Sequence, residues 1–184
     1  ESPDVLTDDG VIVGFDLVIG NPPYIRAEAL GREVKGIYNS TYKTAYKQYD
    51  ILVLFFEKGI EIAKNQAPLS FIVSNKFLIS DFGAKLRTYI LDNSTFTEAI
   101  DVSYDSVFTE ASVYPYIICL QKEKDQKARA KNEIVFKSSF LVENSIRIPQ
   151  SSFNSEGQIF DFTSFESGWM KKVEGKTVQL GDII

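Results

Sequence analysis

Apolar residues gather in short runs along this chain, and the runs alternate between the lengths typical of strands and of helices. Residues 15–20 form a short apolar run of strand length. Residues 51–64 carry apolar side chains at helical spacing, at Ile51, Leu54, Phe55 and Ile62. Asp50 stands where a helix N-cap belongs. The pattern therefore predicts a strand at residues 15–20 and a helix at residues 51–64.

The later apolar runs predict further elements of both kinds. Four more strands are expected, at residues 69–73, 96–102, 113–120 and 134–136. A helix is expected between the first two of these strands, at residues 82–91, with Ser80 or Asp81 at its start. The run at 113–120 is so apolar that we expect it in the centre of a sheet.

Two stretches lack a clean period. Residues 25–49 carry scattered charge and several tyrosines, which indicates a long loop with room for a short helix. A loop of this length in a compact domain is usually functional or disordered. Residues 122–132 are rich in charge, and we expect them to form a solvated hairpin tip.

The bulk composition is that of one globular domain. The chain has 184 residues, of which 44% are hydrophobic and 13% aromatic, so it is long enough to bury one core. Its formal net charge of −5 argues mildly against a nucleic-acid surface, because phosphate contacts need Lys and Arg. Net charge does not exclude a local basic cleft.

The absence of histidine from the whole sequence removes several kinds of chemistry. Ser-His and Cys-His catalysis and His-ligated zinc are excluded, and no metal site is expected. Cys119 lies inside an apolar run, where it is expected to be a small buried hydrophobe. One cysteine permits no internal disulfide, which suits a reducing cytoplasm. No signal peptide or long apolar span is visible, so we expect a cytoplasmic protein without a membrane partner.

Residues 21–24 read Asn-Pro-Pro-Tyr and follow the first predicted strand directly. Two prolines end the strand, because they fix φ and remove ladder donors. They leave a stiff tetrapeptide at the strand's carboxyl end, where open α/β sheets bind their ligands. Its amide, backbone carbonyl and aromatic ring suit a planar group that carries an amino substituent. The alternative is an ordinary turn with a packed tyrosine.

Several segments of the chain resemble, in the right order, the motifs of one enzyme family. Besides residues 21–24, the likeness rests on residues 49–58, 69–78, 106–110 and 116–122. The chain resembles S-adenosylmethionine-dependent amino-methyltransferases with the (Asn/Asp/Ser)-Pro-Pro-(Tyr/Phe/Trp) signature. In particular, it is similar to adenine-N6 DNA methyltransferases of bacterial restriction-modification systems, including the type IIG kind. The resemblance implies an α/β fold: part of a Rossmann-like methyltransferase domain, with a mixed, mostly parallel sheet flanked by helices.

The resemblance also implies how the chain is divided. Residues 1–140 correspond to the central and C-terminal part of the catalytic domain, and residues 141–184 to a linker and the start of a target-recognition domain. The sequence begins with Glu1 and not with Met, so a fragment of a longer protein is expected. The remainder of that polypeptide is then a partner of this chain.

By motif match, the resemblance assigns catalytic roles to residues 21–24. The side-chain oxygen of Asn21 and the backbone carbonyl of Pro22 would accept hydrogen bonds from the target amine, with Pro23 completing the motif. Tyr24 would stack on an adenine flipped out of double-stranded DNA. Phe108 is expected to cover the other face of the base, unless it is a core aromatic.

The cofactor implied by the resemblance is S-adenosyl-L-methionine. Phe55 matches the position that packs on the cofactor's adenine, although its spacing suits a core residue equally well, and Asp50 is a second candidate. The family's cofactor strand carries a glycine-rich turn before the Asn-Pro-Pro-Tyr motif. The 20 residues before Asn21 contain no such turn, so the isolated fragment is expected to be inactive. Lys76, at the end of a predicted strand, would either contact DNA or only help to end the strand.

Two other interpretations remain open at this point. Glutamine methyltransferases and some RNA methyltransferases share the Asn-Pro-Pro-Tyr motif, but they usually lack the long insert at 25–49 and the segment after 140. A catalytically dead half-domain that serves as a scaffold is the non-enzyme alternative.

Overall fold

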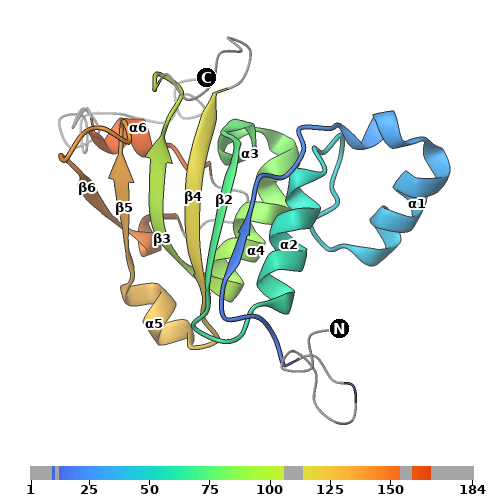
Figure 1. Cartoon of the computed structure of the whole chain (residues 1–184), viewed down its shortest axis with the longest axis horizontal. Coiled ribbons are helices and arrows are strands. Elements are labelled where there is room, and N and C mark those ends of the chain that lie inside the picture. Colours follow the sequence, from blue (N-terminus) through green and yellow to red (C-terminus); the bar gives the residue numbers. More distant parts are fainter. Residues whose placement is uncertain (1–9, 11–12, 106–113, 154–158, 167–184) are drawn as a thin grey trace, which may run out of the picture.

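A six-stranded sheet forms the centre of the chain (Figure 1). The computed structural model describes residue 10 and residues 13–105, 114–153 and 159–166. The strands lie in the order β1-β2-β4-β3-β5-β6. Their bounds are Val18–Gly20 for β1, Pro68–Ser74 for β2, Ser94–Asp101 for β3, Pro115–Lys122 for β4, Glu133–Lys137 for β5 and Ile146–Pro149 for β6.

Four of these strands run in one direction. β1 is parallel to β2, and β3 is parallel to β5. β4 runs antiparallel to both β2 and β3, and β6 runs antiparallel to β5. The sheet is therefore mixed, with β1, β2, β3 and β5 sharing a direction. This arrangement confirms the predicted α/β fold class and the central place of the apolar run in β4.

Helices connect the strands and cover the sheet. The α-helices are α1 (Arg32–Thr41), α2 (Leu52–Ile62), α3 (Lys76–Ile79), α4 (Ala84–Asn93), α5 (Gln126–Lys131) and α6 (Phe162–Glu166). Short 3-10 helices are η2 (Ala27–Leu30), η3 (Asp81–Gly83) and η4 (Gln150–Phe153). Across the described part of the chain, none of the helices has the length and apolar character needed to cross a membrane.

Helix α2 packs very closely on β2 because it carries a glycine at the contact. A Cβ atom added at Gly59 would lie 2.5 Å from Cδ1 of Leu69 and 3.1 Å from Cζ of Phe71. Phe56, one turn earlier, packs edge-on against Phe71 with ring centroids 5.1 Å apart. This close approach fixes the height of α2 above the sheet, and so the position of the chain that enters the helix.

An aromatic cluster closes the core on the other side of β4. Phe96 of β3 contacts Phe160 and Phe162 with ring centroids 5.8 and 5.5 Å apart. The Phe160 backbone N–H donates to the carbonyl of Leu78 at 2.8 Å, which ties residues 159–166 to α3. These late residues therefore share the core of the sheet. The division of the chain at residue 140 stays a prediction.

The two stretches without clean periodicity both contain helix. Residues 25–49 form η2 and the ten-residue α1, a longer helix than expected, and Figure 1 shows α1 projecting away from the sheet. None of the residues of α1 is buried, so no apolar stripe facing the core marked it in the sequence. Between β4 and β5 the chain forms α5 and not a hairpin tip, because β4 and β5 are not neighbours in the sheet. The Asp125 carboxylate caps α5 by accepting from Lys127 N–H at 2.9 Å.

Candidate active site

The Asn-Pro-Pro-Tyr loop lies at the carboxyl end of β1, beside the carboxyl end of β2. The two strands are parallel, with Gly20 opposite Phe71, so their ends meet at one edge of the sheet. A Cβ atom at Gly20 would lie 3.0 Å from Cε1 of Phe71. Because glycine has no Cβ, the Phe71 ring packs directly against the backbone of β1 here. α3 begins at this same edge with Lys76. The sheet thus brings residues 21–24 and Lys76 together although they are some fifty positions apart in the sequence.

Two hydrogen-bond acceptors of the loop have no partner among the described residues. Pro22 is buried, whereas Asn21, Pro23 and Tyr24 are exposed. The Pro23 carbonyl accepts from Ile25 N–H at 3.1 Å, which closes a tight turn. Within the described residues, neither the Asn21 side chain nor the Pro22 carbonyl has a hydrogen-bond partner. The loop therefore presents two oxygen acceptors and an aromatic ring from one short, stiff segment.

The residues after Tyr24 are fastened to the start of α2. Ala27 N–H donates to the Tyr49 carbonyl at 3.0 Å, and Ile51 N–H donates to the Ile25 carbonyl at 2.9 Å. The N-cap of α2 is Ile51 and not Asp50, one residue later than the sequence predicted. The Asp50 carboxylate still accepts from Leu52 N–H, the first residue of the helix, at 3.1 Å. These contacts hold the loop and the first turn of α2 as one unit.

Electrostatics link Tyr24 and Asp50 within this unit. Burial, and then the Asp50 charge, raise the pKa of the Tyr24 hydroxyl above its ordinary value. Burial raises the pKa of the Asp50 carboxyl, although Lys76 and Arg26 act in the opposite direction. Tyr24 therefore stays a neutral phenol at physiological pH, and its ring is 38% exposed. A neutral, exposed ring of this kind suits stacking against a planar group.

Phe55 lies in the first turn of α2 with its ring 43% exposed, while the neighbouring Phe56 is 0% exposed. Phe55 is therefore not a core residue, which removes the alternative that its helical spacing left open. Its contact with a cofactor adenine stays a prediction, as does a cofactor role for Asp50. Phe108 falls outside the described residues, and its place opposite Tyr24 also stays a prediction.

A cavity of about 590 Å³ opens next to this unit. Its lining residues are mostly charged or polar in type, and they come from the chain after Tyr24, the end of the 25–49 insert, and the α3–η3 region. The lining residues are Arg26, Lys47, Gln48, Asp50, Lys76, Ser80, Asp81 and Phe82. Three cations and two carboxylates leave one net positive charge on these walls.

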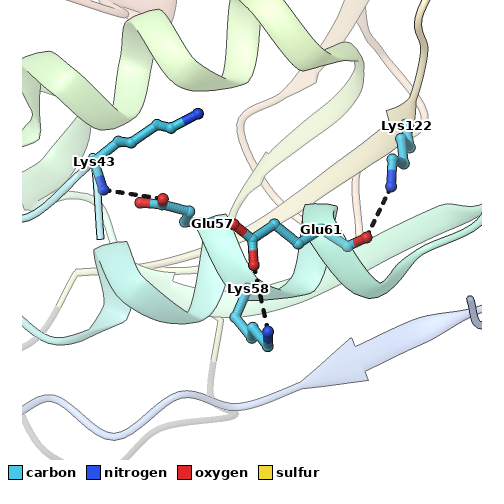
Figure 2. A network of polar contacts seen from close by, with 5 residues as sticks. All are labelled: Lys43, Glu57, Lys58, Glu61 and Lys122. Carbon is cyan, nitrogen blue, oxygen red and sulfur yellow. Dashed lines mark hydrogen bonds and ion pairs between the residues drawn. The ribbon is translucent and has the colours of Figure 1, made fainter. Parts of the chain in front are cut away.

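A buried carboxylate holds the insert in place beside the cavity (Figure 2). Glu57 of α2 is 1% exposed, and its two oxygens accept from Lys43 N–H at 3.0 Å and Thr44 N–H at 2.8 Å. The Thr44 hydroxyl donates in turn to the Val53 carbonyl at 3.1 Å. At the far end of α2, the Lys122 ammonium donates to the carbonyls of Glu61 and Ala63 at 2.9 and 2.7 Å. Glu57 therefore anchors the segment that carries Lys47 and Gln48 to the cavity wall.

Sequence reasoning missed most of the cavity. Lys76 was a candidate because it follows a strand on the ligand side, but Arg26, Lys47 and Gln48 were hidden among the scattered charges of residues 25–49. The one usable signal was the position of Arg26, two residues after the aromatic residue of the loop.

Comparison with solved structures defines the class of fold. A Listeria monocytogenes protein described as a class I S-adenosylmethionine-dependent methyltransferase superposes with a TM-score of 0.55 at 18% identity, over 72% of this chain and 39% of that protein. The type IIL restriction-modification enzyme MmeI, whose structure was solved in complex with DNA, gives a TM-score of 0.51 at 16% identity, over 72% of this chain and 18% of MmeI. The chain has the fold of part of a methyltransferase domain.

Sequence comparison narrows the class to one family. The family model of the Eco57I restriction-modification methylase matches residues 6–108, which is more than half of the chain. The type II restriction enzyme and methyltransferase RM.Eco57I of Escherichia coli is 29% identical over 176 residues, which cover 92% of this chain and 18% of RM.Eco57I. The chain belongs to the Eco57I restriction-modification methylase family and spans about a fifth of the length of this relative.

Proposed function

We propose that this chain forms part of the catalytic domain of a DNA methyltransferase of a restriction-modification system. In this proposal, the enzyme methylates N6 of adenine in a specific sequence of double-stranded DNA. The observation that carries the proposal is the loop at residues 21–24 at the carboxyl end of β1, which holds an exposed ring and two acceptors that lack partners in the described part of the chain. Membership of the Eco57I restriction-modification methylase family supports it.

The loop acts on the target amine by accepting its hydrogen bonds. The exocyclic nitrogen of adenine is a weak nucleophile because its lone pair is delocalised into the ring. The Asn21 side-chain oxygen and the Pro22 carbonyl each accept one N–H of the amine, and both favour the positive charge that develops on nitrogen as it attacks. With S-adenosyl-L-methionine bound, the nitrogen would take the methyl group as the S–CH3 bond breaks and the sulfur leaves as a neutral thioether, and the methylated amine would then release one proton to solvent. Orientation of the amine by two fixed acceptors contributes much of the remaining rate.

Tyr24 holds the base that carries this amine. A base inside a duplex is out of reach, so the target adenine has to be flipped out of the stack. The exposed Tyr24 lies in the same tetrapeptide as the two acceptors, separated from Pro22 by one residue. A base stacked on its ring would have to turn its amino edge toward Asn21 and Pro22. Stacking of this kind contributes about 1–3 kcal/mol per base.

The residues present fit one part of S-adenosyl-L-methionine. When bound, this cofactor supplies a methyl group on a positively charged sulfur. Phe55 offers an exposed ring in the first turn of α2, close to the loop, and would pack against the cofactor's adenine. None of the described residues forms the glycine-rich turn that would hold the ribose and methionine parts.

Mutation of Asn21 tests the proposal in the full-length protein. We expect Asn21→Ala to slow incorporation of tritiated methyl groups into DNA by about 10- to 150-fold, since a hydrogen bond to a charged group contributes about 1.5–3 kcal/mol. Cofactor binding should persist, because Asn21 acts on the amine. Asn39→Ala, at an exposed position of α1, is the matched control and should keep wild-type turnover. Wild-type turnover in Asn21→Ala would reduce the loop to an ordinary turn.

A further inference from the structure

We propose that Arg26 and Lys76 form a binding site for one phosphodiester of the DNA backbone next to the flipped base. This inference rests on the proposed function and adds a second contact to it. The loop at residues 21–24 takes the base, and the cavity beside it takes the backbone that carries the base. Neither Arg26 nor Lys76 has a role in the chemistry proposed above.

The two cations reach the cavity from separate parts of the chain. Arg26 lies two residues after Tyr24, and Lys76 begins α3 at the carboxyl end of β2. Both line the 590 Å³ cavity, and both act electrostatically on the Asp50 carboxyl, which lines the same cavity. A guanidinium and an ammonium that converge on one polar cavity are the groups with which proteins hold phosphate.

The charges of Arg26 and Lys76 are available, whereas that of the third cation is not. Lys47 forms an ion pair with Asp81 at 2.8 Å between Nζ and Oδ2. Across the residues that the structure describes, neither the Arg26 nor the Lys76 side chain makes a hydrogen bond or an ion pair. Both residues are exposed, so solvent or a ligand reaches them.

The cations of the cavity outnumber its carboxylates by one. Asp81 is paired with Lys47, and an oxygen of Asp50 accepts from Leu52 N–H at the start of α2. Gln48 and Ser80 add neutral side chains that can donate hydrogen bonds to phosphate oxygens. The lining therefore keeps a net positive charge, although the whole chain carries −5.

The position of the cavity selects DNA as the source of the phosphate. Arg26 and the base-stacking Tyr24 are separated by one residue, so a phosphate held at Arg26 is one that flanks a base held at Tyr24. Flipping rotates the target nucleotide about its own backbone, so the flanking phosphates are the groups that must be held still. Contacts of this kind position the duplex without reading its sequence.

Salt dependence of DNA binding by the full-length protein tests the site. The association constant for DNA falls as salt rises, and Arg26→Gln and Lys76→Gln should each make the slope of its logarithm against log salt less negative by about 0.9. The affinity deficit of each variant relative to wild type then shrinks by about 3.5-fold between 50 and 200 mM salt. The matched control is Lys127→Gln, which removes one exposed charge from α5 at the opposite end of the sheet (Figure 1). Lys127 has no ion-pair partner in the part of the chain that the structure describes. This control should keep the wild-type slope. Unchanged slopes for Arg26→Gln and Lys76→Gln, or an equal change in the control, would overturn the site.

A chemical probe on the DNA locates the contact. Mapping of methylated adenines in treated DNA gives the recognition sequence, and a duplex is then made with one neutral methylphosphonate beside the target adenine. If Arg26 or Lys76 binds that phosphate, its substitution should cost affinity on the natural duplex and almost none on the modified one. Equal costs on the natural and the modified duplex, found with the methylphosphonate placed in turn at each of the two flanking positions, would overturn the site. A wild-type protein that binds no duplex would overturn the proposed function itself.

Discussion

Glu57 offers a direct test of how the insert is held at the site. Its carboxylate is buried and accepts two backbone N–H groups from the end of the insert, at Lys43 and Thr44. Thr44 is fully buried, so no water replaces a lost acceptor there, whereas Lys43 is exposed and its N–H can turn to solvent. A buried hydrogen bond to a charged group contributes about 1.5–3 kcal/mol. Glu57→Ala should therefore lower the free energy needed to open this segment locally by about that amount. Glu57→Gln should lower it by less, because the amide oxygen of Gln can still accept from Thr44 N–H.

Hydrogen exchange of the peptide that covers residues 43–50 measures this closure. A loss of about 1.5–3 kcal/mol corresponds to a 10- to 150-fold faster exchange of the Thr44 amide in Glu57→Ala, if this amide exchanges by local opening. Glu61→Ala is the control, because Glu61 lies one turn later on α2 and its carboxylate makes only a surface ion pair with Lys58 at 3.4 Å. If Thr44 exchanges equally fast in Glu57→Ala and Glu61→Ala, Glu57 does not anchor the insert.

Two further predictions concern the base-binding aromatics and the packing of α2. Tyr24→Ala and Phe108→Ala should each reduce the fluorescence change of 2-aminopurine placed at the target position. Each should also slow methylation by about 5- to 150-fold, which corresponds to the loss of one stacking contact. An effect of Tyr24→Ala alone would leave Phe108 outside the site. Gly59→Ala should lower the free energy of unfolding by about 1–3 kcal/mol, because its Cβ would press on Leu69. Gly36→Ala, with open space around it in α1, should not destabilise the protein in the same urea titration.

Five of the six strands, β1 to β5, and the loop at residues 21–24 were the features that the sequence specified best, whereas β6 was not predicted. β2 and β4 are apolar runs with clear ends, and the two prolines of the loop end β1 whatever surrounds them. Phe55 was harder to place, because nearly every residue from Ile51 to Phe56 is apolar. Such a run predicts a helix but leaves open which side faces the core, and only the close contact at Gly59 decides it.

Helix α1 and the phosphate site could not be predicted, because both depend on contacts between distant residues. α1 buries no side chain, and its end is held by Glu57, which lies 13 positions beyond Thr44 in the sequence. Arg26 and Lys76 meet only because β1 and β2 are parallel neighbours. Apolar periodicity reports what each segment buries, but it does not report which loops two strands bring together.

Identification of the methylated product tests the central claim most directly. The full-length protein is incubated with double-stranded DNA and S-adenosyl-L-methionine labelled in the methyl group, and the digested nucleosides are separated and identified by mass spectrometry. The loop at residues 21–24 predicts that the label appears in N6-methyldeoxyadenosine with wild-type protein and is lost with Asn21→Ala. A label found on cytosine or on a protein glutamine, or in N6-methyldeoxyadenosine at the wild-type rate with Asn21→Ala, would contradict it.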